Sequence, residues 1–176
     1  MKTTLLASLR ADVTALRTYL FAAVFVAGNI IAPQLAHLIP GGGPMLLPIY
    51  FFTLLAAYRY GMMAGLVTAV VSPLANHLLF GMPSEAMLAI IFTKSVLLAL
   101  VAGYAGHFTR DAVRLWHLAV VVIAYQALAM PFEAMITGSW AMAIQDVRVG
   151  WIGLVIQVIG GYGAVRYASD RYASLR

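Results

Sequence analysis

Two charged side chains lie inside strongly apolar stretches of this sequence. Lys94 falls within the apolar run 86–108, and Glu133 falls near the end of the run 115–136. A charge inside a membrane costs at least about 2.5 kcal/mol on insertion scales, so such a group faces a partner or a watery cavity. Lys94 and Glu133 form either a buried ion pair that only fixes helix packing or a pocket in which Lys94 receives a ligand anion. Because a buried ion pair stabilises weakly once desolvation is counted, we favour the pocket.

Further polar and aromatic side chains fall at similar depth in the neighbouring runs, or in the connection after residue 136, and suit ligand binding. Amide and imidazole groups can satisfy a ligand's polar atoms, and aromatic rings can stack on or enclose a ring. The candidate substrate-binding residues are Lys94, Glu133, Asn76, His77, Trp140, Trp151, Gln157 and Tyr125. We expect Lys94→Met to abolish tight binding and to leave folding largely intact.

Enzyme and metal chemistry have little support. The sequence has no Cys, and His77 stands apart from His37 and His117, which lie on other apolar runs without an acidic neighbour. A metal site is therefore not expected, and no cofactor is indicated. There is no phosphate-binding glycine loop, no His-Glu-x-x-His and no Gly-x-Ser-x-Gly, so we do not expect an enzyme. Active transport would need energy from a partner or an ion gradient.

The elements that position these residues are six apolar runs. The chain is 63% hydrophobic and 10% charged, with a mean hydropathy of +0.92, and an ordinary soluble domain has about a quarter charged residues. Runs of about 20 apolar residues without alternation fit helices, which satisfy their own backbone in hydrocarbon. We predict an all-α integral membrane bundle, a single domain over residues 1–176. Its six transmembrane helices are predicted at 19–39, 46–58, 62–80, 86–108, 115–136 and 149–167.

The second run is too short to cross alone. Its 13 residues would span about 20 Å at 1.5 Å per residue, against a hydrocarbon core of about 30 Å. The preceding segment 40–44, three glycines between two prolines, is either a flexible connector or a loop folded inward over the bundle.

The cations indicate the orientation of the bundle. Six spans put both termini on one side, and all but two of the 11 Lys and Arg residues fall in the tails or in the second and fourth connections. By the positive-inside rule, that side and both termini are cytoplasmic. The nine are Lys2, Arg10, Arg17, Arg59, Arg110, Arg114, Arg166, Arg171 and Arg176. Residues 1–17 are predicted to form a cytoplasmic interfacial segment, and the net charge of +5 suits contact with anionic lipid rather than nucleic acid.

A stripe of small residues marks the first run. Ala23 and Ala27 are four residues apart and so lie on one face of a helix, where small side chains let another helix approach closely. Spacing alone favours packing within the bundle over an interface with a partner.

Several motifs carry a resemblance to a known family. The segments are GPMLLPIY at 43–50, YGMMAGLV at 60–67, SPLA at 72–75 and LFGMP at 79–83. With six helices, cytoplasmic termini and this length, the chain resembles the substrate-binding S-components of energy-coupling factor (ECF) vitamin transporters. The similarity is most specific from Gly43 to Pro83 and weakens through the last two spans.

The resemblance implies a function and partners. In that family, Ala-x-x-x-Ala, here Ala23 to Ala27, packs against a transmembrane T-component that couples to two ATPases. It implies a prokaryotic cytoplasmic membrane, an outward-facing pocket for a vitamin-like molecule, and rotation of the subunit in the membrane on docking. Lys94 stands where many relatives carry Glu, which suggests a ligand with an anionic group. Position 2 is Lys2 rather than a metal-binding His, so metal uptake is disfavoured.

Two other classes of function remain open on the sequence. A stand-alone secondary transporter or channel would use Lys94 and Glu133 as a proton relay. A structural membrane subunit would use the small-residue stripes as an interface and bind no small molecule.

Overall fold

The computed structural model describes residues 15–174, with side chains for residues 15–170. The regular elements of this part of the chain are all helices, and it contains no strand. Residues 1–14 of the predicted interfacial segment 1–17 lie outside the described residues. The elements in chain order are α2 (Leu16–Ala36), α3 (Gly42–Leu46), α4 (Pro48–Tyr60), α5 (Met62–Phe80), α6 (Glu85–Thr109), η1 (Arg110–Ala112), α7 (Leu115–Thr137), α8 (Trp140–Ala143), α9 (Gln145–Arg148) and α10 (Trp151–Ser174).

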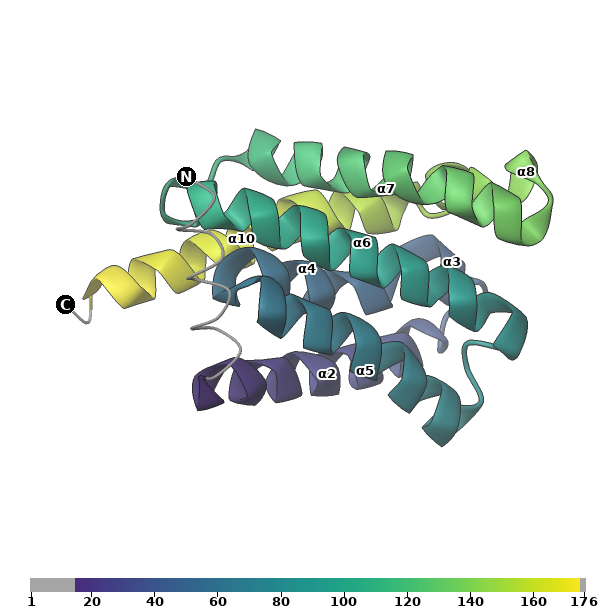
Figure 1. Cartoon of the computed structure of the whole chain (residues 1–176), viewed down its shortest axis with the longest axis horizontal. Coiled ribbons are helices and arrows are strands. Elements are labelled where there is room, and N and C mark those ends of the chain that lie inside the picture. The colour runs from purple at the N-terminus through teal and green to yellow at the C-terminus, as the bar shows by residue number, and fades with distance from the viewer. Residues whose placement is uncertain (1–14, 175–176) are drawn as a thin grey trace.

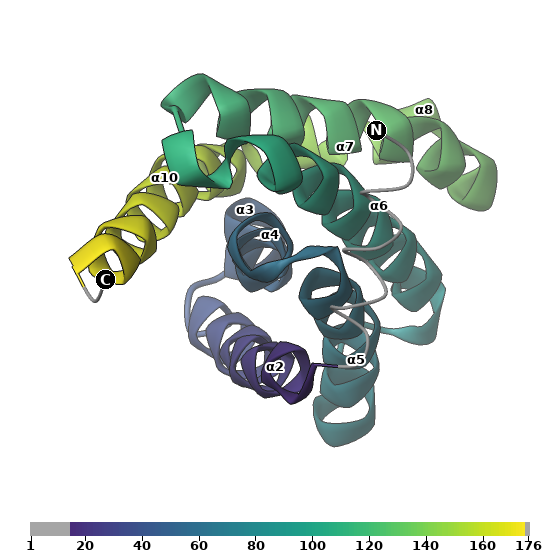
Figure 2. The ribbon, with the colours of Figure 1, turned by 60° about the vertical axis from the view of Figure 1, so that its left-hand side comes forward.

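Helix α4 is the centre of the bundle. It packs against α2, α5, α6 and α10, which surround it in Figure 2. Eight of its 13 residues are buried. Glycines allow the neighbours to come close, since a Cβ at Gly65 would overlap Ala57 and one at Gly106 would overlap the Tyr58 carbonyl. A helix enclosed in this way contacts protein rather than lipid, so it does not need the length of a lipid-facing span.

The described residues contain four helices long and apolar enough to cross a membrane. They are α2, α5, α6 with its continuation through η1, and α7. This supports a multi-pass membrane protein. The predicted count of six spans includes α4, which is too short, and α10, which carries Arg166 and Asp170 near its end and is not among the four.

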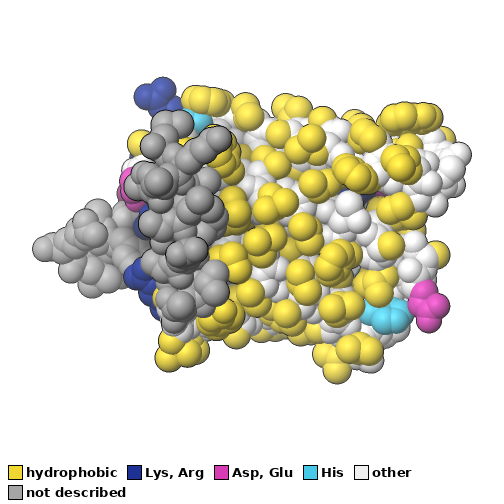
Figure 3. Space-filling view, in the orientation of Figure 1, with side chains coloured by type: hydrophobic (Ala, Val, Ile, Leu, Met, Phe, Trp, Pro, Cys, Tyr) yellow, Lys and Arg dark blue, Asp and Glu magenta, His cyan; other side chains and the backbone are white. Residues whose placement is uncertain are grey.

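The two ends of the bundle differ in charge. Of the seven Lys and Arg side chains in the described part of the chain, five lie on the start of α2, the end of α4, η1, the residue before α7 and the last turns of α10. These segments share the end where the described chain begins and finishes, on the left of Figure 1. Apolar side chains cover the body of the molecule to the right of that end in Figure 3, as expected for a lipid-facing surface.

The glycine-rich segment after α2 is folded and packed. Gly41 has a φ of +72° and starts α3, and Leu47 has a φ of +48° and separates α3 from α4. A Cβ at Gly153 would overlap the Leu46 carbonyl, so the first turn of α10 lies directly against α3. Of the two alternatives for this segment, the structure therefore has the inward fold. It caps the end of the bundle opposite these five arginines.

Candidate functional site

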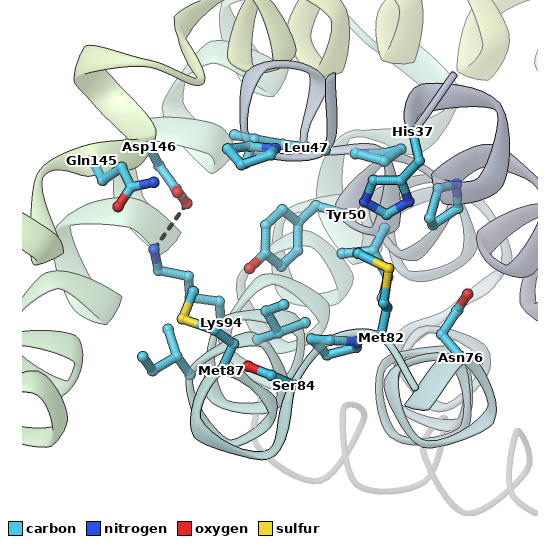
Figure 4. A pocket seen from close by; sticks show the side chains of 18 of the residues that line it. His37, Leu47, Tyr50, Asn76, Met82, Ser84, Met87, Lys94, Gln145 and Asp146 are labelled. Atoms are coloured by element: carbon cyan, nitrogen blue, oxygen red, sulfur yellow. Dashed lines mark hydrogen bonds and ion pairs between the residues drawn. The ribbon is translucent and has the colours of Figure 1, made fainter. Parts of the chain in front are cut away.

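A cavity of about 380 Å³ opens at the end of the bundle opposite the five clustered arginines. Ligand pockets for small molecules begin at about 300 Å³ and are mostly apolar with a few polar groups. Helices α2, α4, α6, α7 and α9, the segment containing α3, and the α5–α6 loop all contribute to its wall. Apolar lining residues include Pro33, Leu47, Met82, Met87, Ile90 and Ile91. Figure 4 shows side chains from several of these elements facing a common space.

One wall of the cavity carries three ionisable side chains in direct contact. Lys94 Nζ donates to Asp146 Oδ2 at 2.8 Å and makes a second ion pair with Glu133 Oε2. The exposed fractions of the three side chains are 3% for Lys94, 5% for Glu133 and 15% for Asp146. Gln126 Nε2 also donates to Asp146 Oδ2, at 3.3 Å. We call Lys94, Glu133 and Asp146 the ion cluster.

The ion cluster joins three elements that are distant in sequence. Lys94 lies on α6, Glu133 on the last turns of α7, and Asp146 on the short helix α9. The sequence left two alternatives for Lys94 and Glu133, an ion pair or a ligand-binding pocket; the structure brings them together as an ion pair, and both line the cavity. Asp146 is not among the predicted site residues, because the sequence of the connection after residue 136 does not indicate which side chain of α9 faces Lys94.

Tyr50 forms the floor between the ion cluster and the core. Its ring projects into the cavity with the hydroxyl turned to the side of Lys94 (Figure 4). Behind it, the Tyr125 ring lies with its centroid 6.0 Å from that of Tyr50. Tyr125 donates its hydroxyl proton to Gln157 Oε1 at 3.1 Å. Tyr125 and Gln157 are fully buried and do not line the cavity, so they support Tyr50 instead of contacting a ligand.

Asn76 lines the cavity, but its amide nitrogen serves the backbone. Pro33 has no N–H, so the carbonyl of Asn29 in α2 lacks its usual helical donor. Asn76 Nδ2 donates to that carbonyl at 2.9 Å and to the Ser72 carbonyl at 2.9 Å. Asn29 in turn donates its side-chain amide to Thr53 Oγ1 at 2.9 Å. The main contact of Asn76 therefore joins α5 to the backbone of α2 at the break caused by Pro33.

The remaining predicted residues lie outside the cavity wall. His77 Nδ1 lies 2.8 Å from the carbonyl oxygen of Pro83 and holds the α5–α6 loop, whose Pro83 does line the cavity. Trp140 and Trp151 are 66% and 57% exposed at the starts of α8 and α10. Trp is common at membrane–water interfaces, which suits these positions. Within the described residues, no group of three or more His, Asp and Glu side chains could hold a metal ion.

No family model, curated protein or solved structure matches the chain in the three comparisons. The function is therefore inferred from the geometry of the cavity.

The ion cluster changes what replacement of Lys94 should do. Lys94→Met leaves Glu133 and Asp146 buried together without a cation, and breaking a buried pair in this way costs about 3–5 kcal/mol. We expect that loss of unfolding free energy in detergent, measured by circular dichroism during denaturant titration. The earlier expectation of largely intact folding is thus replaced.

A triple variant and a surface control make that test specific. Adding Glu133→Gln and Asp146→Asn to Lys94→Met removes the stranded carboxylates and should recover at least half of the loss. Glu85→Gln, an exposed carboxylate in the first turn of α6, should change the free energy by less than about 1 kcal/mol. Unchanged stability of Lys94→Met would show that the ion cluster does not form.

The role of Asn76 predicts a rescue. Asn76→Ala leaves the Asn29 carbonyl without a donor, and we expect a loss of about 1–3 kcal/mol. Pro33→Ala restores the helical N–H four residues after Asn29. In the Pro33→Ala background the same Asn76 substitution should therefore cost clearly less, as measured by unfolding of the four proteins of the cycle. Equal costs in both backgrounds would argue against this role.

Proposed function

We propose that this protein is the substrate-binding membrane subunit of an ECF-type importer for a vitamin-like small molecule. The observation that carries the proposal is the cavity of about 380 Å³ that ends on a buried ion cluster. Intramembrane charges are costly, and their usual sites are ligand and ion pathways. The resemblance of residues 43–83 to ECF S-components supports the same reading, since these residues supply α3, α4, α5 and the α5–α6 loop.

The charges at the end of the bundle opposite the cavity support an orientation in the membrane. Arginines gathered where the described chain begins and finishes favour a cytoplasmic position for that end. With α4 and α10 counted as crossing elements, six helices span the bilayer and the cavity faces outward. The cytoplasmic membrane of a prokaryote is the compartment that the family resemblance supports.

The proposed docking surface for the transporter's T-component is the outer face of α2. The inner face of this helix packs against α4 and α5, whereas Ala23 and Ala27 are exposed. Their neighbour Val24 is 66% exposed. Small side chains on an apolar, uncovered face fit close approach of a partner helix. Rotation of the whole subunit on docking would then carry the cavity toward the cytoplasm, with ATP hydrolysed by two partner ATPases.

The binding function predicts a co-purifying small molecule. Protein purified from cells into lipid nanodiscs and then denatured should release one small molecule in near-stoichiometric amount, identified by mass spectrometry. Met87→Trp places a large ring in the cavity wall and should lower the yield at least tenfold. Leu100→Trp makes the same change on the exposed side of α6 and should not lower it. Release of nothing from the unmodified protein would contradict the binding function and favour a structural subunit.

The docking surface predicts a separate defect in uptake. In cells with the complete importer, Ala23→Leu combined with Ala27→Leu should lower uptake of the released molecule at least tenfold, while the purified variant still retains that molecule. Ala127→Leu on the exposed side of α7 is the control and should transport normally. Normal uptake by the double variant would show that α2 is not the docking surface. Uptake into proteoliposomes holding this protein alone would instead favour a secondary transporter.

A further inference from the structure

The ion cluster has one cation and two anions. Lys94 contributes one positive charge, and Glu133 and Asp146 contribute two negative charges when ionised. The cavity therefore ends on a wall with a net charge of −1. The lining residues also include His37, which lies across the cavity from Lys94 in Figure 4.

The unused hydrogen-bonding capacity of the cluster consists mainly of acceptors. Of its three N–H groups, Lys94 donates one to Asp146 Oδ2, and its contact with Glu133 Oε2 is an ion pair. Among the described residues, Glu133 Oε2 is buried without a hydrogen-bond partner, and both donors that reach Asp146 use Oδ2. The nearby amide of Gln126 already donates to Asp146. A bound group would thus meet carboxylate oxygens more than free N–H donors.

This wall would repel an anionic group of a ligand and would bind a hydrogen-bond donor. A carboxylate or phosphate entering the cavity has to lie beside two carboxylates in a site with little water, where like charges interact strongly. An ammonium, amidine or amide N–H group instead supplies the donors that Glu133 and Asp146 lack. The rest of the wall, with Met87, Ile90 and Leu47, suits an apolar or aromatic body.

We infer that the cavity selects a small molecule with an apolar body and a cationic or hydrogen-bond-donating nitrogen group, which binds Glu133 and Asp146. This inference rests on the proposed binding function and replaces the anionic ligand suggested by Lys94 in the sequence. The nitrogen group binds at the ion cluster, and the apolar body extends past Tyr50 toward the α5–α6 loop.

Two compounds of matched shape test this charge preference. Tryptamine and indole-3-propionate share the indole ring and a two-carbon arm but end in an ammonium and a carboxylate. Each is titrated at pH 7 into ligand-free protein in phosphatidylcholine nanodiscs, with ligand-observed NMR as readout and Met87→Trp protein as the blank for lipid adsorption. The dissociation constant of tryptamine should be at least tenfold lower than that of indole-3-propionate.

Charge-neutral variants identify the source of the preference. Asp146→Asn, the change at the most exposed member of the cluster, should reduce the preference for tryptamine, and addition of Glu133→Gln should reverse it because Lys94 is then unopposed. Glu85 lies outside the cavity wall, so Glu85→Gln should leave the preference for tryptamine unchanged.

The outcomes separate failure of this inference from failure of the proposed function. Equal or tighter binding of indole-3-propionate to the unmodified protein overturns the inference alone. A preference for tryptamine that persists in full after both substitutions overturns it as well. If neither compound binds the unmodified protein better than Met87→Trp, the cavity is not a binding site, and the proposed function fails together with the inference.

Discussion

The need to neutralise Lys94 inside the bundle constrains this whole end of the molecule. An ammonium within an apolar helix is tolerated only with partners, and here the partners come from α7 and from α9 in the connection that follows it. The contact fixes the last turns of α7 against α6 and holds α9 over the end of the bundle. Desolvation offsets much of the attraction in a buried ion pair. We therefore infer that the ion cluster serves to fix the geometry of the site and to recognise a ligand more than to stabilise the fold.

The central position of α4 explains why a cavity exists beside this cluster. A helix of 13 residues does not fill the length of its longer neighbours, and the remaining depth is closed by α3, which packs against the start of α10 at Gly153. Leu47, in the left-handed region at a φ of +48°, makes the turn between the two helices. Non-glycine residues in this region carry strain and are often found at functional sites. The space left below α3 is the cavity.

Local sequence patterns predicted the helices well and the site only in part. The run 62–80 coincides with α5, and 115–136 matches α7 within one residue, because long apolar periodicity and flanking glycines or arginines mark such ends. Lys94 and Glu133 could be predicted as site residues because a charged residue within an apolar run itself indicates a partner or a cavity. Asp146 and the backbone role of Asn76 were missed, since each depends on which groups three-dimensional packing leaves without a partner. Trp140 and Trp151 share the depth of the cavity but not its wall, a difference that depth alone does not reveal.

The most direct test of the account is an experimental structure of the protein purified from cells and crystallised in a lipid phase without added ligand. We predict a bound small molecule in the cavity between Tyr50 and the ion cluster, with Lys94 in contact with both Glu133 and Asp146 and a nitrogen of the molecule within hydrogen-bond distance of a carboxylate. A structure in which α9 lies away from Lys94 and side chains fill the cavity would contradict it.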